Sequence, residues 1–471
     1  MPHNNELRLR AFDFAKFFAH LGFYTVAIQT VGFLSMLIKF RYLQAELMGV
    51  LGYFVALANM PPAFFENFSR MIGRFVPTAA SKRQAEIILV SFLCQSAILA
   101  AFAVVTAGLV WGFESMRFWV GHGIDPRLSL YMTAFIVLLV PLNMLSSLLG
   151  TCVSAWQKLR AVLVVDLVVA SANLVVTIIV SLSVDDRITG LKITAFSTLV
   201  SASTVMLMRL LLFTRNVEVA AHLRALRVRQ WPDITRSVYR QYLRTYTLPL
   251  QLTGVFWYLT ENLAVILFAR AGLMAEAGIY SLINRIFSVP RKFVPQLLSA
   301  IMPRLVISKE RDPAVFGPKY VLLSWGQWGV HAVFASALLA ALPLIQTLSG
   351  LPRGTSVLVL FGAFSFNLLL HAMVTSNSNL ILLSSDTRWV LLTSGLRAVV
   401  VTALNVTLIP MWQTYGAALA FLVSSTFVLG MYLYENRASG VLGVRVNARQ
   451  FGASLALAAL WVAVAKVLGA W

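Results

Sequence analysis

Two stretches of this sequence share one pattern, and that pattern decides how the rest of the chain is interpreted. Residues 41–64 read RYLQAELMGVLGYFVALANMPPAF, and residues 270–293 read RAGLMAEAGIYSLINRIFSVPRKF. Both stretches are mostly apolar, and four residues coincide at one constant spacing of 229 positions. The matched pairs are Arg41 with Arg270, Gly49 with Gly278, Pro61 with Pro290 and Phe64 with Phe293, while Glu46 is one position out of register with Glu276.

A second match occurs further along each half of the chain, at the nearly equal spacing of 224 positions. Internal repeats of this kind underlie many membrane transporters, in which the substrate site lies between the repeats. We therefore expect a transporter built from two related halves that share the same orientation. The second set of matches is Asn143, Thr151 and Ser154 with Asn367, Thr375 and Ser378.

The composition places the chain in a membrane, since 59% of its 471 residues are apolar and 12% are charged. A membrane-spanning helix needs about 20 mostly apolar residues. The apolar runs are continuous, whereas barrel strands alternate, so helices are favoured. We predict an all-α polytopic membrane protein with 12 core transmembrane helices in two six-helix pseudo-symmetric lobes, plus a 13th C-terminal helix. The predicted spans are 16–38, 43–66, 84–112, 129–152, 158–182, 190–213, 244–270, 274–304, 320–348, 354–382, 388–410, 412–435 and 449–470.

The longest polar connection between spans divides the chain into its two lobes. Arginines such as Arg224 and Arg227 alternate with apolar residues there, which is typical of an amphipathic helix lying on a membrane surface. A solvated basic tether is the alternative interpretation. The predicted parts are an N-terminal six-helix lobe at 1–213, a cytoplasmic amphipathic linker at 214–243, a C-terminal six-helix lobe at 244–435 and an extra helix at 436–471.

The formal net charge of +20 is explained by topology rather than by a nucleic-acid partner. Most Lys and Arg residues fall in segments that would lie on the same side as the N-terminus, and such segments are cytoplasmic by the positive-inside rule. We therefore expect a cytoplasmic N-terminus, basic residues in contact with anionic lipid head groups, and no nucleic-acid partner.

Two polar stripes run along the predicted spans two and eight. Charged residues at this depth cost several kcal/mol unless they face a cavity or a partner, so they are candidates for function. Spans one and seven carry further polar residues, and the four helices together would line a cavity between the lobes. The candidate cations are Arg70, Arg74, Arg285, Arg291 and Lys292, and the candidate polar residues are Asn59, Asn67, Ser288, Gln296, Gln251, Tyr258, Asn262, His20 and Tyr24.

Carboxylates are scarce in these four spans, where Glu66 and Glu261 are the candidates for binding a coupling ion, H⁺ or Na⁺. Glu261 could instead pair with Arg285, and the cations could all belong to structural ion pairs. With so few acids, the cavity would keep a positive charge that suits phosphate or pyrophosphate, for which the guanidinium fork is well shaped. No other cofactor is expected, and Cys94 and Cys152 support neither a metal site nor a disulfide framework.

Two further stretches carry a resemblance to a known family. They contain Ala269–Arg270–Ala271–Gly272 with Glu276–Ala277–Gly278–Ile279–Tyr280, and Asn405, Ile409 and Pro410 followed by Gly416–Ala417–Ala418–Leu419–Ala420. With the span count and the two halves, they resemble the polysaccharide transporter family of the multidrug/oligosaccharidyl-lipid/polysaccharide flippase superfamily. The 13th span departs from the commonest twelve-helix form of that family.

The resemblance implies a two-lobed bundle whose central cavity carries a polyprenyl-pyrophosphate-linked oligosaccharide, such as an O-antigen or exopolysaccharide unit, across the bacterial inner membrane. Basic cavity residues of this family are thought to engage the pyrophosphate, which here implicates Arg70, Arg74, Arg285, Arg291 and Lys292. Such a protein is expected to be a transporter and not an enzyme. It is expected to act as a monomer, with glycan polymerase machinery as a candidate partner.

Two other functions are alternatives to the flippase, namely a multidrug exporter and a membrane enzyme. A cation-coupled multidrug or toxin exporter of the same superfamily shares the bundle, but its substrates are usually cationic, which the predicted cavity charge disfavours. A membrane enzyme of glycan assembly would need a sizeable outer loop with acidic or histidine catalysts, whereas the longest predicted outer connection, about 113–128, is short.

Overall fold

The computed structural model describes residues 2–111, 125–156, 158–242, 248–291, 313–382, 387–437 and 441–467, and all regular secondary structure in these ranges is helical. The first half of the chain forms long helices that pack against one another, with α1 against α5, α4 against α6, and α2 against α3 and α4. Its elements are α1 (Pro2–Ala58), α2 (Met60–Phe75), η1 (Val76–Thr78), α3 (Ser81–Trp111), α4 (Pro126–Ala155), α5 (Leu159–Ser183) and α6 (Arg187–Thr214).

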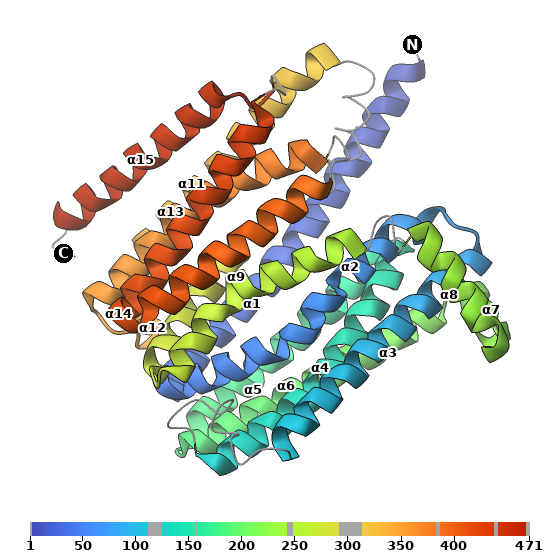
Figure 1. Cartoon of the computed structure of the whole chain (residues 1–471), viewed down its shortest axis with the longest axis horizontal. Helices are drawn as coiled ribbons and strands as arrows, with labels where there is room; N and C mark the ends of the chain where they lie inside the picture. The colour runs from blue at the N-terminus through green and yellow to red at the C-terminus, as the bar shows by residue number, and fades with distance from the viewer. Residues whose placement is uncertain are drawn as a thin grey trace.

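The second half repeats this type of packing, with α14 against α9 and α13, and α13 against α11. α15 contacts α11 and α13, and it lies on the outer side of this group of helices (Figure 1). The elements are α9 (Leu248–Arg270), a helix over 274–291, α11 (Pro313–Ala340), α12 (Leu342–Ser349), α13 (Thr355–Leu382), α14 (Thr387–Asn436) and α15 (Val444–Val467).

Two of the labelled helices each contain a break at one residue, so each corresponds to two predicted spans. α1 breaks at Gln44, whose φ is 62°, and α14 breaks at Gln413, whose φ is 49°. Left-handed backbone is costly for residues other than glycine, and one such residue interrupts a helix. With these breaks counted, and with α11 and α12 taken as one span, the helices of the described residues follow the order of the predicted twelve core spans and the additional C-terminal helix.

The second predicted span also contains a break and extends further than expected. α1 ends at Ala58, and α2 starts at Met60 with Pro61 and Pro62 in its first turn and continues to Phe75 rather than to the predicted residue 66. Proline has no N–H to donate to the preceding turn, so a helix that reaches two prolines is interrupted there. The predicted ninth span is likewise bent, by 54° between α11 and α12.

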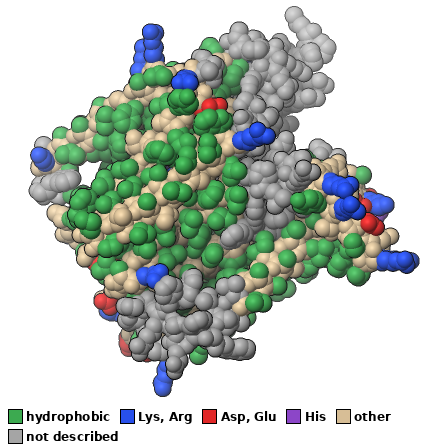
Figure 2. All heavy atoms as spheres, viewed as in Figure 1, with side chains coloured by type: hydrophobic (Ala, Val, Ile, Leu, Met, Phe, Trp, Pro, Cys, Tyr) green, Lys and Arg blue, Asp and Glu red, His purple; other side chains and the backbone are tan. Residues whose placement is uncertain are grey.

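The described residues contain nine helices long and apolar enough to cross a membrane, or ten if the bent α11–α12 pair is one span. Apolar side chains cover most of the described face that Figure 2 shows, and Lys and Arg gather near the ends of the molecule. That distribution is what a bilayer requires of the surface it surrounds. The chain is a multi-pass helical membrane protein.

The predicted amphipathic linker at 214–243 contains two short α-helices with a 3₁₀ turn between them. They are α7 (Val217–Ala225), η3 (Val228–Gln230) and α8 (Trp231–Val238), and they pack against α3 at the edge of the molecule (Figure 1). The helix is interrupted because Leu226 and Arg227 take extended backbone conformations between the two segments.

Candidate functional site

The two halves meet where α1 and α2 contact α9, the region in which the sequence places its candidate cavity. A close backbone approach joins the region of Gly49 on α1 to that of Gly278 on helix 274–291. Nearby, the Tyr258 hydroxyl on α9 donates a hydrogen bond of 3.1 Å to the backbone carbonyl of Ala56. This bond crosses from one half to the other at the interrupted end of α1.

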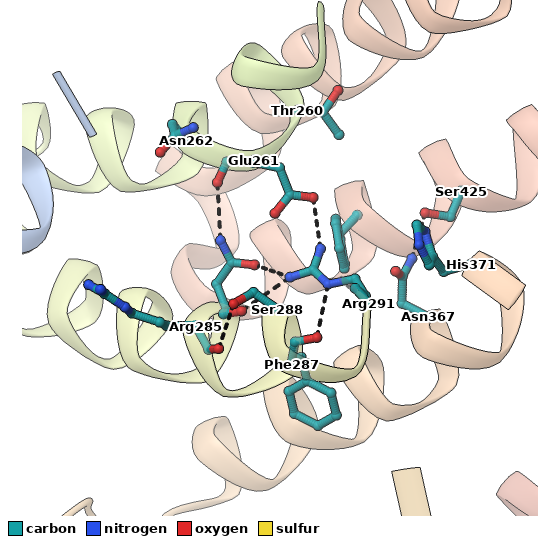
Figure 3. Close-up of polar contacts among 12 residues, drawn as sticks. Thr260, Glu261, Asn262, Arg285, Phe287, Ser288, Arg291, Asn367, His371 and Ser425 are labelled. Atoms are coloured by element: carbon teal, nitrogen blue, oxygen red, sulfur yellow. Dashed lines mark hydrogen bonds and ion pairs between the residues drawn. The ribbon is translucent and has the colours of Figure 1, made fainter. Parts of the chain in front are cut away.

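Arg285 lies at this boundary and points away from the polar network around Arg291 (Figure 3). Its side chain is exposed, although its neighbours Ile286 and Phe287 are buried. In the part of the chain that the structure describes, no carboxylate lies within ion-pair distance of Arg285. The guanidinium is therefore a charge without a compensating acid among the described residues.

A second cation, Lys39 on α1, lies close enough to Arg285 for the two like charges to repel each other. Lys39 is half-buried, and it comes from the opposite half of the chain. Two cations from the two halves within electrostatic range of each other create a positive potential, which an anion nearby would reduce.

Arg291, which is predicted to line the cavity beside Arg285, has a different environment from Arg285. It is 8% exposed, and its Nη1 donates to Glu261 Oε1 on α9 at 2.7 Å. Its other donors reach the carbonyl oxygens of Phe287 and Asn284 and the Asn284 amide oxygen (Figure 3). Arg291 and Glu261 thus form a nearly buried, hydrogen-bonded ion pair, so of the alternatives left open above Glu261 pairs with Arg291 and not with Arg285.

The physical reason for this difference is the period of the helix. Residues six positions apart on an α-helix differ in direction by roughly 120°. Arg285 faces the other half of the molecule, so Arg291 faces the interior of its own half, where it lies near the rings of Phe364 and Phe421, 5.9 and 5.7 Å from their centroids.

Further polar groups extend this network through the second half. Arg397 on α14 donates to Ser425 Oγ at 3.2 Å, and the Asn367 amide on α13 also donates to that oxygen. The rings of His371 and His331 lie 6.1 Å apart, and His331 Nδ1 is 2.8 Å from the Gln327 carbonyl. These are residues of a hydrogen-bonded interior.

The first half contains an ion pair that the sequence pattern does not single out. Arg209 on α6 donates to both oxygens of Asp166 on α5, at 2.6 and 2.8 Å, and also to Ser146 Oγ on α4. Asp166 lies in a strongly apolar run, so its partner on another helix is not visible in the local pattern. This pair and the Arg291–Glu261 pair are compensated charges, in contrast to Arg285.

The remaining predicted residues are placed as follows. Asn262 donates to the Tyr258 carbonyl, Ser288 donates to the Arg285 carbonyl, Asn59 is exposed at the break after α1, and Tyr24 is half-buried against Phe23. Other predicted residues lie outside the described side chains. These are His20, Glu66, Asn67, Arg70, Arg74, Gln251, Lys292 and Gln296.

Lys39 is the residue of this site that sequence reasoning missed. The first span is predicted to end at residue 38, which puts Lys39 in an outer turn, but the helix continues to a break at Gln44. A lysine directly after the mostly apolar run 31–38 is the signal that could have indicated it.

The fold is that of known transporters of the MOP superfamily. One similar structure is a lipid II flippase MurJ in an inward closed conformation, with a TM-score of 0.66, 11% identity and coverage of 95% of this chain and 98% of that one. Another is an inward-facing multidrug resistance MATE family transporter of that superfamily, with a TM-score of 0.63, 13% identity and coverage of 91% and 98%. The eukaryotic MATE transporter AtDTX14 gives 0.52, 13%, 94% and 99%.

No protein-family model matches the sequence, and no curated protein matches it either. At these identities the likeness shows the fold alone. Flippases and multidrug exporters share this fold, so the chemistry of the site has to distinguish them.

Proposed function

We propose that this protein is a flippase that moves a polyprenyl-pyrophosphate-linked oligosaccharide across the bacterial inner membrane by alternating access. The observation that carries the proposal is Arg285, an exposed guanidinium at the boundary of the two halves with no carboxylate partner among the described residues. A charge at bilayer depth is costly and is retained where it contacts a substrate or lines a water-filled path. Lys39 adds a second positive charge from the opposite half.

Pyrophosphate is the anion that suits this arrangement. A guanidinium donates two parallel hydrogen bonds to phosphate oxygens, and an ammonium group contributes a compact positive charge. A pyrophosphate between Arg285 and Lys39 would relieve the repulsion between them. Arg70, Arg74 and Lys292 are proposed to extend this positive surface, on the sequence pattern and the family resemblance.

The contact between the halves near Gly49 and Gly278 fits one state of the proposed cycle. With a cytoplasmic N-terminus, as the positive-inside rule favours, this contact lies at the outer end of the helices. Closure at that end is expected of an inward-facing state, and the two neighbours with the higher TM-scores above are described as inward-facing and inward closed. In the outward-facing state these contacts would separate.

Reconstitution into liposomes tests the proposal. The purified protein should accelerate the translocation of a fluorescent polyprenyl-pyrophosphate oligosaccharide, followed by quenching of the outer leaflet. Arg285→Gln and Lys39→Gln should each reduce the rate at least tenfold, whereas Arg353→Gln, at an exposed site outside the boundary, should not. An absence of acceleration, or equal rates in all four proteins, would contradict the proposal.

A cation-coupled multidrug exporter is the second candidate, and the fold comparisons support it equally, since two of the structures above are MATE transporters. The two functions differ in the charge of the substrate. Transport of a cationic dye by the same liposomes, increased by Arg285→Gln, would favour the exporter. Transport of the pyrophosphate-linked lipid alone would favour the flippase.

We propose Glu261 and Glu66 as candidate binding residues for a coupling ion, H⁺ or Na⁺. Glu261 already has a cation in contact, the Arg291 guanidinium at 2.7 Å, so H⁺ or Na⁺ would have to compete with a tethered charge. Flipping rates measured with an imposed Na⁺ or pH gradient test this role. A rate that responds to a gradient in the wild type but not in Glu261→Gln would support coupling at Glu261.

We also propose, from the resemblance and the charge distribution, that the N-terminus is cytoplasmic, that the protein is a monomer and that glycan polymerase machinery is its partner. A reporter that fluoresces only in the cytoplasm, fused to the N-terminus, tests the orientation.

A further inference from the structure

The segment α7–η3–α8 carries apolar side chains on two sides, and the protein itself covers one of them. Val219, Ala220 and Val238 are buried, as expected for residues that pack on α3. On the outer side, Val228 is 69% exposed and Tyr239 is 43% exposed. Exposed apolar side chains beside a packed apolar face indicate an interaction surface for something outside the chain.

These outer residues line a shallow groove of about 560 Å³. Its walls combine a long aliphatic and aromatic surface with one charged residue, Arg236. The lining is Val228, Trp231, Pro232, Thr235, Arg236 and Tyr239. Trp and Tyr beside a cationic group are typical of side chains that lie at the boundary between hydrocarbon and lipid head groups.

The surroundings of the groove are strongly basic. Arg227, Arg229, Arg236 and Arg240 are all exposed, and Figure 2 shows Lys and Arg side chains gathered at the end of the molecule where Figure 1 places α7 and α8. Of the acidic residues in this segment, Glu218 accepts a hydrogen bond from Ser81 Oγ on α3. Residues 217–240 contain two acids, Glu218 and Asp233, against five arginines, so the segment keeps a net positive charge.

The groove also contains a donor without an acceptor. The Trp231 indole N–H is buried and has no hydrogen-bond partner among the described residues. Tryptophan N–H groups usually find an acceptor when buried, so this donor is left unsatisfied by the described residues.

The groove is attached to the first half of the molecule through α3. Arg83 on α3 donates to Ser237 Oγ at 3.2 Å and to the Gln241 side chain, and its guanidinium lies 5.3 Å from the Tyr242 ring centroid. Tyr242 in turn packs on Phe75 at the end of α2, with ring centroids 4.6 Å apart. Side-chain contacts thus link the segment that carries the groove to the end of α2 and the start of α3.

We propose that this groove binds an anionic phospholipid of the surrounding membrane, with the phosphate on Arg236 and neighbouring arginines and the glycerol and upper acyl region against Val228, Trp231 and Tyr239. An amphipathic basic segment with exposed aromatic residues lies in the interface of a bilayer and is attracted to anionic lipid. The occupant is a lipid rather than a soluble acidic protein because the segment adjoins the ends of membrane-spanning α3 and α6. This inference does not depend on the transported substrate.

Lipid retention by the full-length protein in neutral detergent tests the proposal, with native mass spectrometry as the readout. The wild type should retain phosphatidylglycerol in preference to phosphatidylcholine, and added salt should weaken this preference because charges at the interface are screened. The double variant Arg229→Gln with Arg236→Gln should lose affinity for phosphatidylglycerol by roughly fivefold for each arginine removed. The matched control, Arg127→Gln with Arg353→Gln, removes the same charge from exposed positions elsewhere and should retain the preference.

A second measurement addresses the apolar part of the groove. A spin label at Val228→Cys, in a background with Cys94 and Cys152 replaced by serine, should be more accessible to oxygen than to a water-soluble nickel reagent in nanodiscs that contain phosphatidylglycerol. Equal retention of both lipids by the wild type, an equal loss in the control variant, or a label accessible mainly to the nickel reagent would overturn the proposal. The last result would leave a soluble acidic partner as the occupant.

Discussion

Gly49 and Gly278, which are equivalent positions of the two repeats, contact each other across the boundary between the halves. A Cβ added to Gly49 would lie 1.9 Å from the Met274 carbonyl oxygen and 3.2 Å from the Gly278 nitrogen. A Cβ added to Gly278 would lie 2.0 Å from the Ala45 carbonyl oxygen and 2.9 Å from the Gly49 nitrogen. The two environments are reciprocal, so the two helices touch backbone to backbone.

A reciprocal contact between equivalent residues occurs only close to a twofold axis. A second pair of equivalent positions supports this. Gly52 and Ser281 are separated by the same spacing of 229 positions, and a Cβ on Gly52 would lie 2.5 Å from the Ser281 hydroxyl. The pseudo-twofold axis of the molecule therefore passes between the start of the second span and the start of the eighth.

Replacement of Gly278 by alanine should destabilise this contact. The added methyl has to displace backbone rather than a flexible side chain, and overpacking of this kind costs about 1–3 kcal/mol. Gly362→Ala is the control, because no neighbouring atom lies within 4 Å of the carbon that it adds. It should instead raise the melting temperature, since alanine favours helix over glycine. Melting temperatures of both variants in detergent check the prediction, and similar increases in both would contradict it.

The Glu261–Arg291 pair should behave as a buried ion pair in a double-mutant cycle. Glu261→Gln or Arg291→Gln alone leaves one charge uncompensated in a mostly buried position, which typically costs about 3–5 kcal/mol. The double variant should be more stable than the sum of the single changes indicates. Thermal unfolding measures all four proteins, and additive losses would show that the two side chains do not act as a pair.

Replacement of Arg285 should reduce transport without reducing stability, in contrast to replacement of Glu261 or Arg291. Its side chain is exposed and has no carboxylate partner among the described residues. Arg285→Gln should therefore change the free energy of unfolding by no more than about 0.5 kcal/mol, with a melting temperature close to that of the wild type. Flipping should nevertheless fall at least tenfold, with partial recovery in Arg285→Lys, which keeps the charge but not the fork. A large loss of stability in Arg285→Gln would instead indicate a structural role.

Tyr258→Phe should weaken the connection between the halves at the interrupted end of α1. It removes the hydroxyl that donates to the Ala56 carbonyl, a bond worth about 0.5–1.5 kcal/mol in net terms. Because the bond joins the two halves, Tyr258→Phe should lower the melting temperature of the protein in detergent. A melting temperature equal to that of the wild type would mean that the bond contributes no stability.

Much of the fold could be predicted from local sequence because the membrane imposes a length and an apolar composition on each spanning helix. Two spans of the first half illustrate this, since predicted 158–182 and 190–213 correspond to α5 (Leu159–Ser183) and α6 (Arg187–Thr214). The turn between the first two spans was less predictable, because the chain reverses at the single residue Gln44 without any run of turn-forming residues.

The site was only partly predictable, and the reason is geometric. Helical spacing identifies which residues of one helix share a face, so it could have separated Arg285 from Arg291. It carries no information on how each helix is rotated against its neighbours. Whether Glu261 meets Arg285 or Arg291 depends on that rotation, and so does the approach of Lys39 to Arg285.

By itself, the sequence determined that this chain crosses a membrane many times as a helical bundle and that its halves are repeats, because hydropathy and repeat spacing are properties of the chain order. Only the tertiary structure decided which charges are compensated. Glu261 and Asp166 each contact an arginine on another helix, whereas Arg285 has no carboxylate partner among the described residues and lies within electrostatic range of Lys39. Pairing depends on distances between helices, and these exist only once the helices have packed.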